Sequence, residues 1–202
     1  MESDIYSTIA QPGESIYKEK GSKFIGYCFH SKTEDEVKAV LDDIHKQHHQ
    51  ARHVCYAYIL DTEGKVFRAN DDGEPSNSAG MPILGQIRSA ELSQTFIAVV
   101  RYFGGVKLGV GGLIQAYKAA AQEAVSNAKI EKRFIMESAA VQVPFDLVNE
   151  VMRILKGDDI KITDQAYDPT SCTVYFESRK SQFQQLIDQL SLIHQAKLIG
   201  ID

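Results

Sequence analysis

A glycine-rich run at residues 101–112 constrains this chain more than any other feature, since five of the nine positions from 104 to 112 are glycine. An apolar segment rich in β-forming residues, Thr95–Tyr102, precedes the run, and an alanine-rich helical pattern follows it over residues 113–129. Glycine tolerates positive φ and lets backbones approach closely. The pattern therefore predicts a tight connection from a strand covered on both faces to a helix.

The same run has the features of an anion site. The first turn of the following helix directs unpaired N–H groups and a partial positive charge back at the connection. Lys107 lies inside the run, and no carboxylate occurs between Glu91 and Glu123. A purely structural interpretation, close packing of glycines, remains open, because neither glycine-rich nucleotide motif matches. The candidate anion- or RNA-binding residues are Arg52, His53, Arg101, Gly104, Gly105, Lys107, Gly109, Gly111 and Gly112.

Charge and composition limit the partners. The net charge is −5, which argues against a general affinity for polyphosphate backbones and for DNA. Residues 1–133 carry 16 basic and 17 acidic side chains, whereas residues 134–202 carry 6 and 10. An RNA contact would therefore come from a local patch in the first part. No apolar run approaches the roughly 20 residues of a membrane span, and the polar start does not resemble a signal peptide, so we expect a cytoplasmic protein without membrane partners.

The three cysteines (Cys28, Cys55 and Cys172) are widely spaced and form no C-x-x-C pair. We interpret them as small core hydrophobes in a reducing compartment.

Hydrophobic periodicity and turn signals predict an α+β chain of two domains, at residues 1–133 and 134–202, divided at the charged segment 129–133. In the first domain we expect a loosely held stretch up to Gly13, strands at 16–19 and 22–30, and a helix from a capping box at Thr33 to about residue 49. A hairpin over 54–70, a polar loop at 71–81 and a short helix opened by Pro82 follow.

The second domain has the order strand, helix, strand, strand, helix, strand, over residues 137–201. Asp146 and Ser181 are the expected helix caps. This order is that of the ferredoxin-like split βαβ fold, and it contains no residue set typical of catalysis.

The polar loop offers a second kind of site. Asp71, Asp72 and Glu74, with Ser76 and Asn77 beside them, have the oxygen ligands that Mg²⁺ prefers. Arg68, Arg88 or Arg101 could instead pair with these carboxylates in a structural network. No metal is assigned with this pattern alone.

Three further groups have both a chemical and a structural interpretation. His45, His48, His49 and His53 could bind zinc or be solvated, and His53 could act as a general base or as a hydrogen-bonding prop. Ser76 and Ser78 could be nucleophiles, although no nucleophile elbow is present, or turn residues. Tyr56, Tyr58, Tyr102 and Phe103 could stack on bases or belong to the core. No residue is assigned as catalytic.

The motifs taken together resemble the signature of the IMPACT family, whose bacterial members are the YigZ-type proteins. The matching segments are residues 51–58 (ARHVCYAY), 71–75 (DDGEP), 79–84 (AGMPIL), 101–109 (RYFGGVKLG), 111–113 (GGL) and 116–117 (AY), with a weaker match at 20–24. One departure is Ser76-Asn77-Ser78, where Gly-Thr is more usual after Glu-Pro.

The resemblance implies a β/α sandwich like the second domain of ribosomal protein S-five, followed by a ferredoxin-like domain. This pair resembles the two C-terminal domains of elongation factor G. Family members are linked to control of translation. The resemblance thus favours a non-enzymatic module that contacts RNA, the ribosome or a translation factor. The alternative is an enzyme acting on a phosphorylated small molecule with Mg²⁺, and a third possibility is a protein partner alone.

Overall fold

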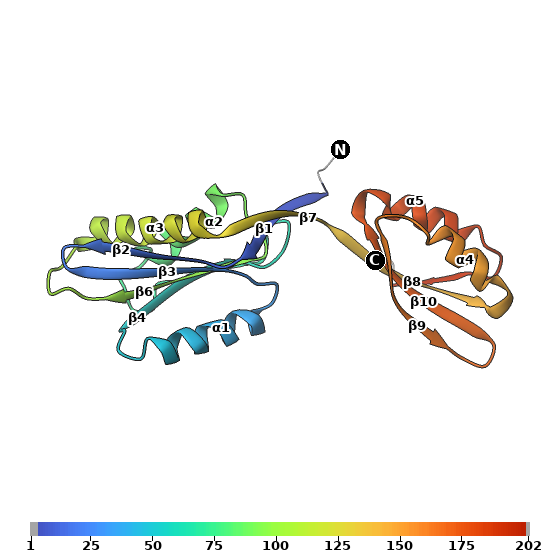
Figure 1. Cartoon of the computed structure of the whole chain (residues 1–202), viewed down its shortest axis with the longest axis horizontal. Helices are drawn as coiled ribbons and strands as arrows, with labels where there is room; N and C mark the ends of the chain where they lie inside the picture. The colour runs from blue at the N-terminus through green and yellow to red at the C-terminus, as the bar shows by residue number, and fades with distance from the viewer. Residues whose placement is uncertain (1–3, 201–202) are drawn as a thin grey trace. The chain divides into compact units, whose positions relative to one another are not determined.

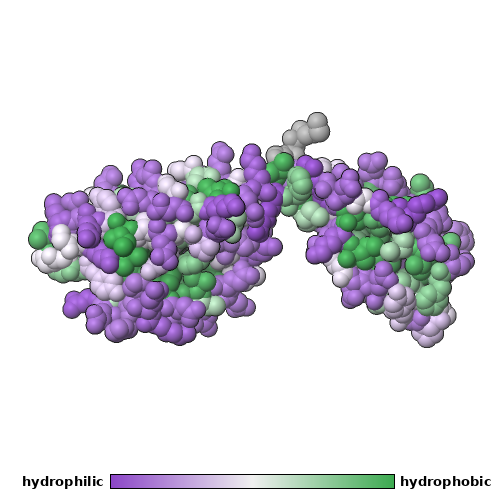
Figure 2. Space-filling model, in the orientation of Figure 1, coloured by the Kyte–Doolittle hydropathy of each residue, from purple (hydrophilic) through white to green (hydrophobic). Residues whose placement is uncertain are grey.

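The computed structural model describes residues 4–200. The chain divides into two compact units, one formed by residues 6–133 and the other by residues 134–200 together with Asp4 and Ile5. Each unit contains both a sheet and helices (Figure 1), so the predicted two-domain α+β fold is confirmed. In the space-filling view, the visible face of each unit is mostly hydrophilic, with apolar patches between the polar side chains (Figure 2).

The N-terminal unit is built on a five-stranded antiparallel sheet. In spatial order its strands are β2 (Gly13–Glu19), β3 (Ser22–His30), β6 (Thr95–Tyr102), β4 (His53–Ile59) and β5 (Phe67–Asn70). The central strand β6 is buried from its first residue to Arg101. Its continuous apolar run is what a strand covered on both faces requires.

Three helices cover the two faces of this sheet (Figure 1). Helices α2 (Gly80–Ser89) and α3 (Gly109–Asn127) pack on one face, and α1 (Glu34–Gln47) packs on the other. The alanine stripe of α3 is fully buried, because its small side chains let the helix lie close to the sheet. This arrangement is the predicted β/α sandwich.

Helix α1 begins at the predicted capping box. The Thr33 hydroxyl accepts a hydrogen bond from the Glu36 amide at 3.2 Å, and the Glu36 carboxylate accepts one from the Lys32 amide at 2.7 Å. The Thr33 half of the predicted box is thus confirmed, whereas the Glu36 carboxylate binds the amide of Lys32 and not that of Thr33.

The prediction of a loosely held stretch before Gly13 is wrong for the residues that the structure describes. Strand β1 (Ile5–Gln11) pairs with β7 (Lys129–Phe134) in a separate two-stranded sheet. The charged segment 129–133 is thus a strand, and the division between the units falls at its end. Residues 1–3 lie outside the described part.

The C-terminal unit has a four-stranded antiparallel sheet in the order β11-β8-β10-β9, which is the ferredoxin-like arrangement. Its elements are β8 (Met136–Pro144), the 3₁₀ turn η1 (Phe145–Leu147), α4 (Val148–Ile154), β9 (Ile160–Tyr167), β10 (Ser171–Arg179), α5 (Lys180–Ser191) and β11 (Lys197–Ile199). Phe176 and Leu190 are fully buried in its core.

The two caps predicted in this unit are wrong. Asp146 lies within η1, and neither η1 nor α4 has a side-chain cap. Helix α5 begins at Lys180, before Ser181, and the Ser181 amide donates to the Asp4 carboxylate at 3.4 Å. Asp4 also receives two hydrogen bonds from Arg179, which hold the pKa of its carboxyl well below the usual range. A carboxylate distant in sequence therefore replaces the local cap.

None of the helices within residues 4–200 combines the length and apolar character needed to cross a bilayer. The three cysteines are buried and free, as expected for core residues.

Candidate anion-binding site

The connection from β6 to α3 is short, and helix α3 starts four residues before the predicted position. Gly109 is therefore the first helical residue, and Gly111 and Gly112 lie in the first turn. Gly105 and Gly109 have φ of +88° and +72°, a conformation that favours glycine. The helix has no side-chain cap, so its first amides are not occupied by a capping oxygen.

Gly104 is required by close approach. A Cβ at this position would lie 1.8 Å from the backbone carbon of Gly21, in the turn between β2 and β3. The Gly104 amide also donates to the Ser22 hydroxyl at 3.1 Å. The structural interpretation of the glycines is thus correct at this position, while the glycines at the start of α3 leave the helix terminus uncovered.

A pocket of about 390 Å³ opens where β6 ends and α3 begins. We call it the β6–α3 pocket. It is lined by Arg52, His53, Glu74, Pro75, Arg101, Phe103, Lys107, Leu108, Gly109, Val110 and Leu113. The antiparallel register of β4 and β6 places His53 opposite Arg101, which brings the two segments together. The pocket therefore collects Arg52, His53, Arg101, Lys107 and Gly109 from the predicted anion-binding set.

Arg101 forms the inner wall of the pocket and is paired internally. Its Nη1 lies 2.5 Å from Oε1 of Glu74, and the Tyr117 hydroxyl donates to the same oxygen at 2.8 Å. The Arg101 and Glu74 side chains are 9% and 4% exposed. Burial raises the pKa of Tyr117, which keeps its hydroxyl protonated as a donor. Pairing of Arg101 with a loop carboxylate, one of the two alternatives open from the sequence, is the one that the structure contains.

Arg52 and Lys107 supply the uncompensated charge at the pocket. Both side chains are exposed, and neither forms an ion pair within residues 4–200. His53 contacts the polar loop, with Nδ1 2.7 Å from the Asp72 carbonyl oxygen. Because a carbonyl oxygen only accepts, Nδ1 carries the proton, and Nε2 remains for a ligand.

The polar loop is held by its own carboxylates. Asp71 accepts hydrogen bonds from the amides of Asn77, Ala79 and Gly80 at 2.8, 3.0 and 2.8 Å, which caps the start of α2. The Asp72 carboxylate accepts from the Val54 amide at 2.6 Å.

Because Glu74 pairs with Arg101, each of the three carboxylates, Asp71, Asp72 and Glu74, accepts hydrogen bonds from a different set of protein groups. Among the described residues, no three His, Cys, Asp or Glu side chains lie together as a metal-binding group. Ser76 and Asn77 are exposed in the same loop.

The histidine cluster is dispersed. His48 lies between two tyrosines, with Nε2 2.7 Å from the Tyr27 hydroxyl and Nδ1 2.9 Å from that of Tyr102. Burial, and secondly the charge of Lys23, lower the pKa of His48. His48 therefore joins the end of α1 to two strands as a structural residue.

Of the four aromatic candidates for base stacking, the three tyrosines make internal contacts and only Phe103 lines the pocket. Tyr58 is buried and donates to Glu34 at 2.5 Å, and Tyr56 stacks beside it on the α1 face. The Tyr102 hydroxyl contacts His48. Phe103 is 55% exposed and lines the β6–α3 pocket. It is the candidate of the four whose ring is available to a ligand.

The serines do not form a nucleophilic site. Ser78 is fully buried and its hydroxyl lacks a hydrogen-bond partner among the described residues, and Ser76 is exposed in the turn.

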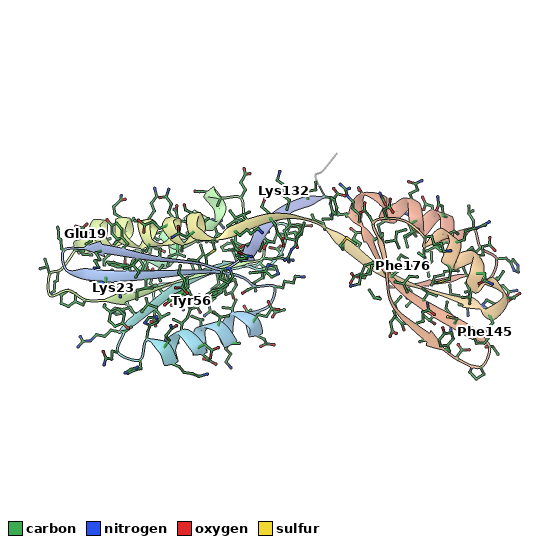
Figure 3. The ribbon with its side chains drawn as sticks, in the orientation of Figure 1. Glu19, Lys23, Tyr56, Lys132, Phe145 and Phe176 are labelled. Carbon is green, nitrogen blue, oxygen red and sulfur yellow. The ribbon has the colours of Figure 1, made fainter. Side chains whose placement is uncertain are left out.

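Sequence reasoning missed the lysines of the β2–β3 turn. Gly21 touches Gly104, so Lys20 and Lys23 lie at the same end of the sheet as Lys107. Figure 3 shows Lys23 and Glu19 at this end of the unit. The run Lys18-Glu-Lys-Gly-Ser-Lys carries the signal, a basic cluster around a turn, but only the pairing of β3 with β6 places it near the site.

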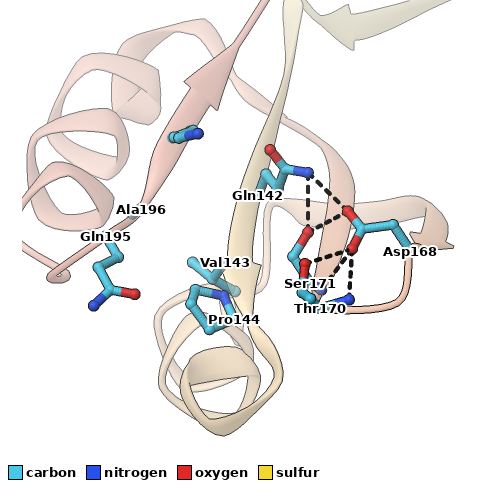
Figure 4. Close-up of a pocket in the computed structure, with 9 residues that line it drawn as sticks. Gln142, Val143, Pro144, Asp168, Thr170, Ser171, Gln195 and Ala196 are labelled. Carbon is cyan, nitrogen blue, oxygen red and sulfur yellow. Dashed lines mark hydrogen bonds between the residues drawn. The ribbon is translucent and has the colours of Figure 1, made fainter.

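A larger pocket, of about 660 Å³, lies in the C-terminal unit (Figure 4). Asp168 dominates one wall, where its carboxylate accepts from the amides of Thr170 and Ser171 at 2.8 and 2.7 Å. Gln142 donates to the same carboxylate at 3.1 Å. The Ser171 hydroxyl also donates to this carboxylate, and this bond, followed by those from the Thr170 and Ser171 amides, lowers the pKa of Asp168 and closes the turn between β9 and β10. Because internal donors engage both carboxylate oxygens, we interpret this wall as structural.

The β6–α3 pocket falls entirely within residues 20–125, the segment that matches the Impact N-terminal domain family. The chain is therefore a two-domain protein in which an Impact N-terminal domain is followed by a ferredoxin-like unit. The chain belongs to the IMPACT family.

Two relatives agree with this assignment, and one solved structure shows the same fold. The IMPACT family member YvyE of Bacillus subtilis is 30% identical over 188 residues, covering 92% of this chain and 87% of YvyE. The family member YigZ of Escherichia coli is 28% identical over 160 residues, covering 78% of each chain. A crystal structure of a hypothetical protein matches with a TM-score of 0.78 and 24% identity, over 99% of this chain and 98% of its own, which shows the same fold.

Proposed function

We propose that this chain is a translation-associated regulatory protein that binds RNA, on the ribosome or on a translation factor complex, through the phosphate-binding face of its N-terminal unit. Membership in the IMPACT family supports the link to translation. One observation carries the site: the β6–α3 pocket brings Arg52, Lys107 and the uncapped start of α3 together in front of the buried Arg101.

The geometry suits phosphate for three reasons. Helix α3 presents backbone amides and the positive end of its dipole, and it has no capping side chain. Lys107 and Arg52 add two cations that have no ion-pair partner among the described residues. Lys20 and Lys23 extend the positive charge beyond the pocket at the same end of the sheet. A local patch of this kind binds anions in a chain whose net charge is −5.

The alternative, an enzyme that uses Mg²⁺ on a phosphorylated small molecule, needs carboxylates that are free to bind metal. Asp71, Asp72 and Glu74 each accept hydrogen bonds from protein groups instead. The geometry therefore favours a binding module, and a partner made only of protein is an outcome of the following test.

The test is co-sedimentation of the full chain with ribosomal subunits across a salt series. We expect Lys107→Ala to weaken association and to lower the slope of log K against log salt by about 0.7 to 0.9, the value for one lost phosphate contact. Lys38→Ala, an exposed lysine on α1, is the matched control and should leave both quantities unchanged. Equal association of the Lys107→Ala variant and the wild type at low salt would exclude this site.

A further inference from the structure

We infer that the β6–α3 pocket takes a single nucleotide unit that ends in a phosphate monoester, with the phosphate at the first turn of α3 and the base against Phe103. This inference rests on the proposed function and narrows it, since it assigns the pocket to the phosphorylated end of an RNA strand. Lys20 and Lys23, in and next to the β2–β3 turn, would then contact the phosphodiester groups of the RNA strand next to this terminal nucleotide.

The phosphate end of the pocket has an open helix terminus and an incompletely satisfied arginine. A Cβ built on Gly109 or Gly111 would meet no atom within 4 Å, so the space beside these two positions is open, whereas at Gly112 the Leu108 side chain lies 3.0 Å away. Arg101 lines the pocket with a side chain that is nine-tenths buried, and its Nε has no hydrogen-bond partner in the described structure. Buried polar groups are normally hydrogen-bonded. This Nε lies behind the pocket wall, whereas Arg52 and Lys107 are exposed, have no ion pair among the described residues and line the pocket independently of the helix terminus.

Charge balance favours a monoester over a phosphodiester. A phosphate monoester carries a charge of about −1.5 to −2 at pH 7, whereas a phosphodiester carries one negative charge. The charges of Arg101 and Glu74 offset each other in their ion pair. Arg52, Lys107 and the helix terminus, with a partial charge of about +0.5, remain to face the ligand. This excess of more than two positive charges matches the doubly charged group.

The rest of the pocket is suited to a base. The exposed Phe103 ring has its centroid 5.6 Å from the Arg101 guanidinium carbon, so the ring borders the same cavity as the charged wall. Leu108, Val110 and Leu113 continue the apolar lining. The volume of about 390 Å³ lies in the range of small-molecule pockets, roughly 300 to 1,000 Å³. An aromatic side chain beside a phosphate-binding turn is the arrangement that stacking on a base requires.

The experiment compares short single-stranded oligoribonucleotides of one sequence with a 5′-phosphate, with a 3′-phosphate or with hydroxyls at both ends. Binding to the full chain is measured by fluorescence anisotropy. We expect one of the phosphorylated ends to bind at least tenfold tighter than the unphosphorylated strand. Lys107→Ala should remove that preference. A phosphodiester backbone contact alone would weaken all three oligonucleotides equally in this variant, and that result would overturn the inference.

The position of the base is tested with a nucleoside monophosphate against ribose 5-phosphate. The nucleoside monophosphate should bind about tenfold tighter than ribose 5-phosphate, as expected for one stacked base. Phe103→Leu should remove this difference and Phe103→Tyr should retain it, because the second variant keeps a ring. Phe103 is largely exposed, so both variants should fold, which circular dichroism verifies. Equal binding of the two ligands to the wild type would overturn the assignment of Phe103.

The inference and the proposed function fail differently. If ribosome association depends on Lys107 but the terminal phosphate has no effect, the inference is wrong and the proposed function stands. If neither the ribosome nor any oligonucleotide binds, both are wrong.

Discussion

Glu74 holds Arg101, which forms the inner wall of the β6–α3 pocket, in place. Its Oε1 receives hydrogen bonds from Arg101 and Tyr117, which belong to β6 and α3. A carboxylate from the polar loop thereby fixes the arginine that lines the pocket. The pair is almost fully buried, and a buried pair costs most when one partner is removed, because the other charge then remains without compensation.

The first prediction is that Glu74→Gln destabilises the N-terminal unit by about 3 kcal/mol, since it leaves the Arg101 charge buried and unpaired. The measurement is the free energy of unfolding in urea. Asp43→Asn is the control, because Asp43 pairs with Lys46 with both side chains 76% exposed. Its loss should cost about 0 to 0.5 kcal/mol. Equal stability of Glu74→Gln and the control would show that the Arg101–Glu74 pair does not stabilise the inner wall of the pocket.

The second prediction concerns pH. Burial lowers the pKa of His48, and burial with the charge of Arg133 lowers that of His30, below the ordinary value of 6.5. At these two histidines the unfolded chain therefore takes up protons before the folded chain does, so both residues reduce stability as pH falls through and below about 6.5. Urea midpoints should thus be lower at pH 5.5 than at pH 7.5.

His48→Gln separates the contribution of this residue, because glutamine cannot take up a proton in this range. The decrease in stability between pH 7.5 and pH 5.5 should be smaller in this variant than in the wild type. An unchanged decrease would assign the effect to other groups.

At the scale of elements, the connection between β6 and α3 is fixed by the turn between β2 and β3. Gly104 lies against Gly21, so the two connections approach each other through bare backbone. This contact sets where the β6–α3 loop turns and hence where Lys107 lies. The glycines at positions 104 and 111 consequently differ in role, although they belong to the same run.

The third prediction uses that difference. Gly104→Ala should destabilise the unit by about 2 to 3 kcal/mol, because its Cβ would lie 1.8 Å from the Gly21 backbone. Gly111→Ala should be neutral or stabilise by about 0.5 to 1 kcal/mol, because it lies in a helix with open space around it. Thermal unfolding of the two variants measures both effects. Similar destabilisation of the two would contradict the different packing at these positions.

At the scale of the whole molecule, each unit has its own hydrophobic core. The cores on the two faces of the N-terminal sheet share no residue with the core of the C-terminal unit. Stability is therefore expected to be distributed between two cooperative units.

The fourth prediction follows from these separate cores. Leu190, on α5, is fully buried, and Leu190→Ala should cost the C-terminal unit about 3 kcal/mol. Calorimetry of the full chain should show two transitions, with Leu190→Ala lowering one midpoint and leaving the other. One transition that moves as a whole would mean that the units unfold together.

Some features of this protein follow from the sequence alone because they depend on neighbours along the chain. The apolar run of β6, the alanine stripe of α3 and the Thr33 capping box each have a local pattern, and each was predicted near its true position. The order of elements predicted over residues 137–201 is that of the ferredoxin-like unit for the same reason, and the structure follows it up to the end of β11 at Ile199.

Only the tertiary structure decided which distant groups meet. The pairing of β1 with β7, the contact of Gly21 with Gly104 and the partner of Arg101 all join segments far apart in sequence. Local periodicity shows which face of a helix or strand is buried, but not which other element packs against it. The sequence therefore places Arg101 near a candidate anion site without showing that Glu74 neutralises its charge. The physical reason is that burial of the Arg101 charge requires a partner, and the packing of the polar loop against the sheet supplies it.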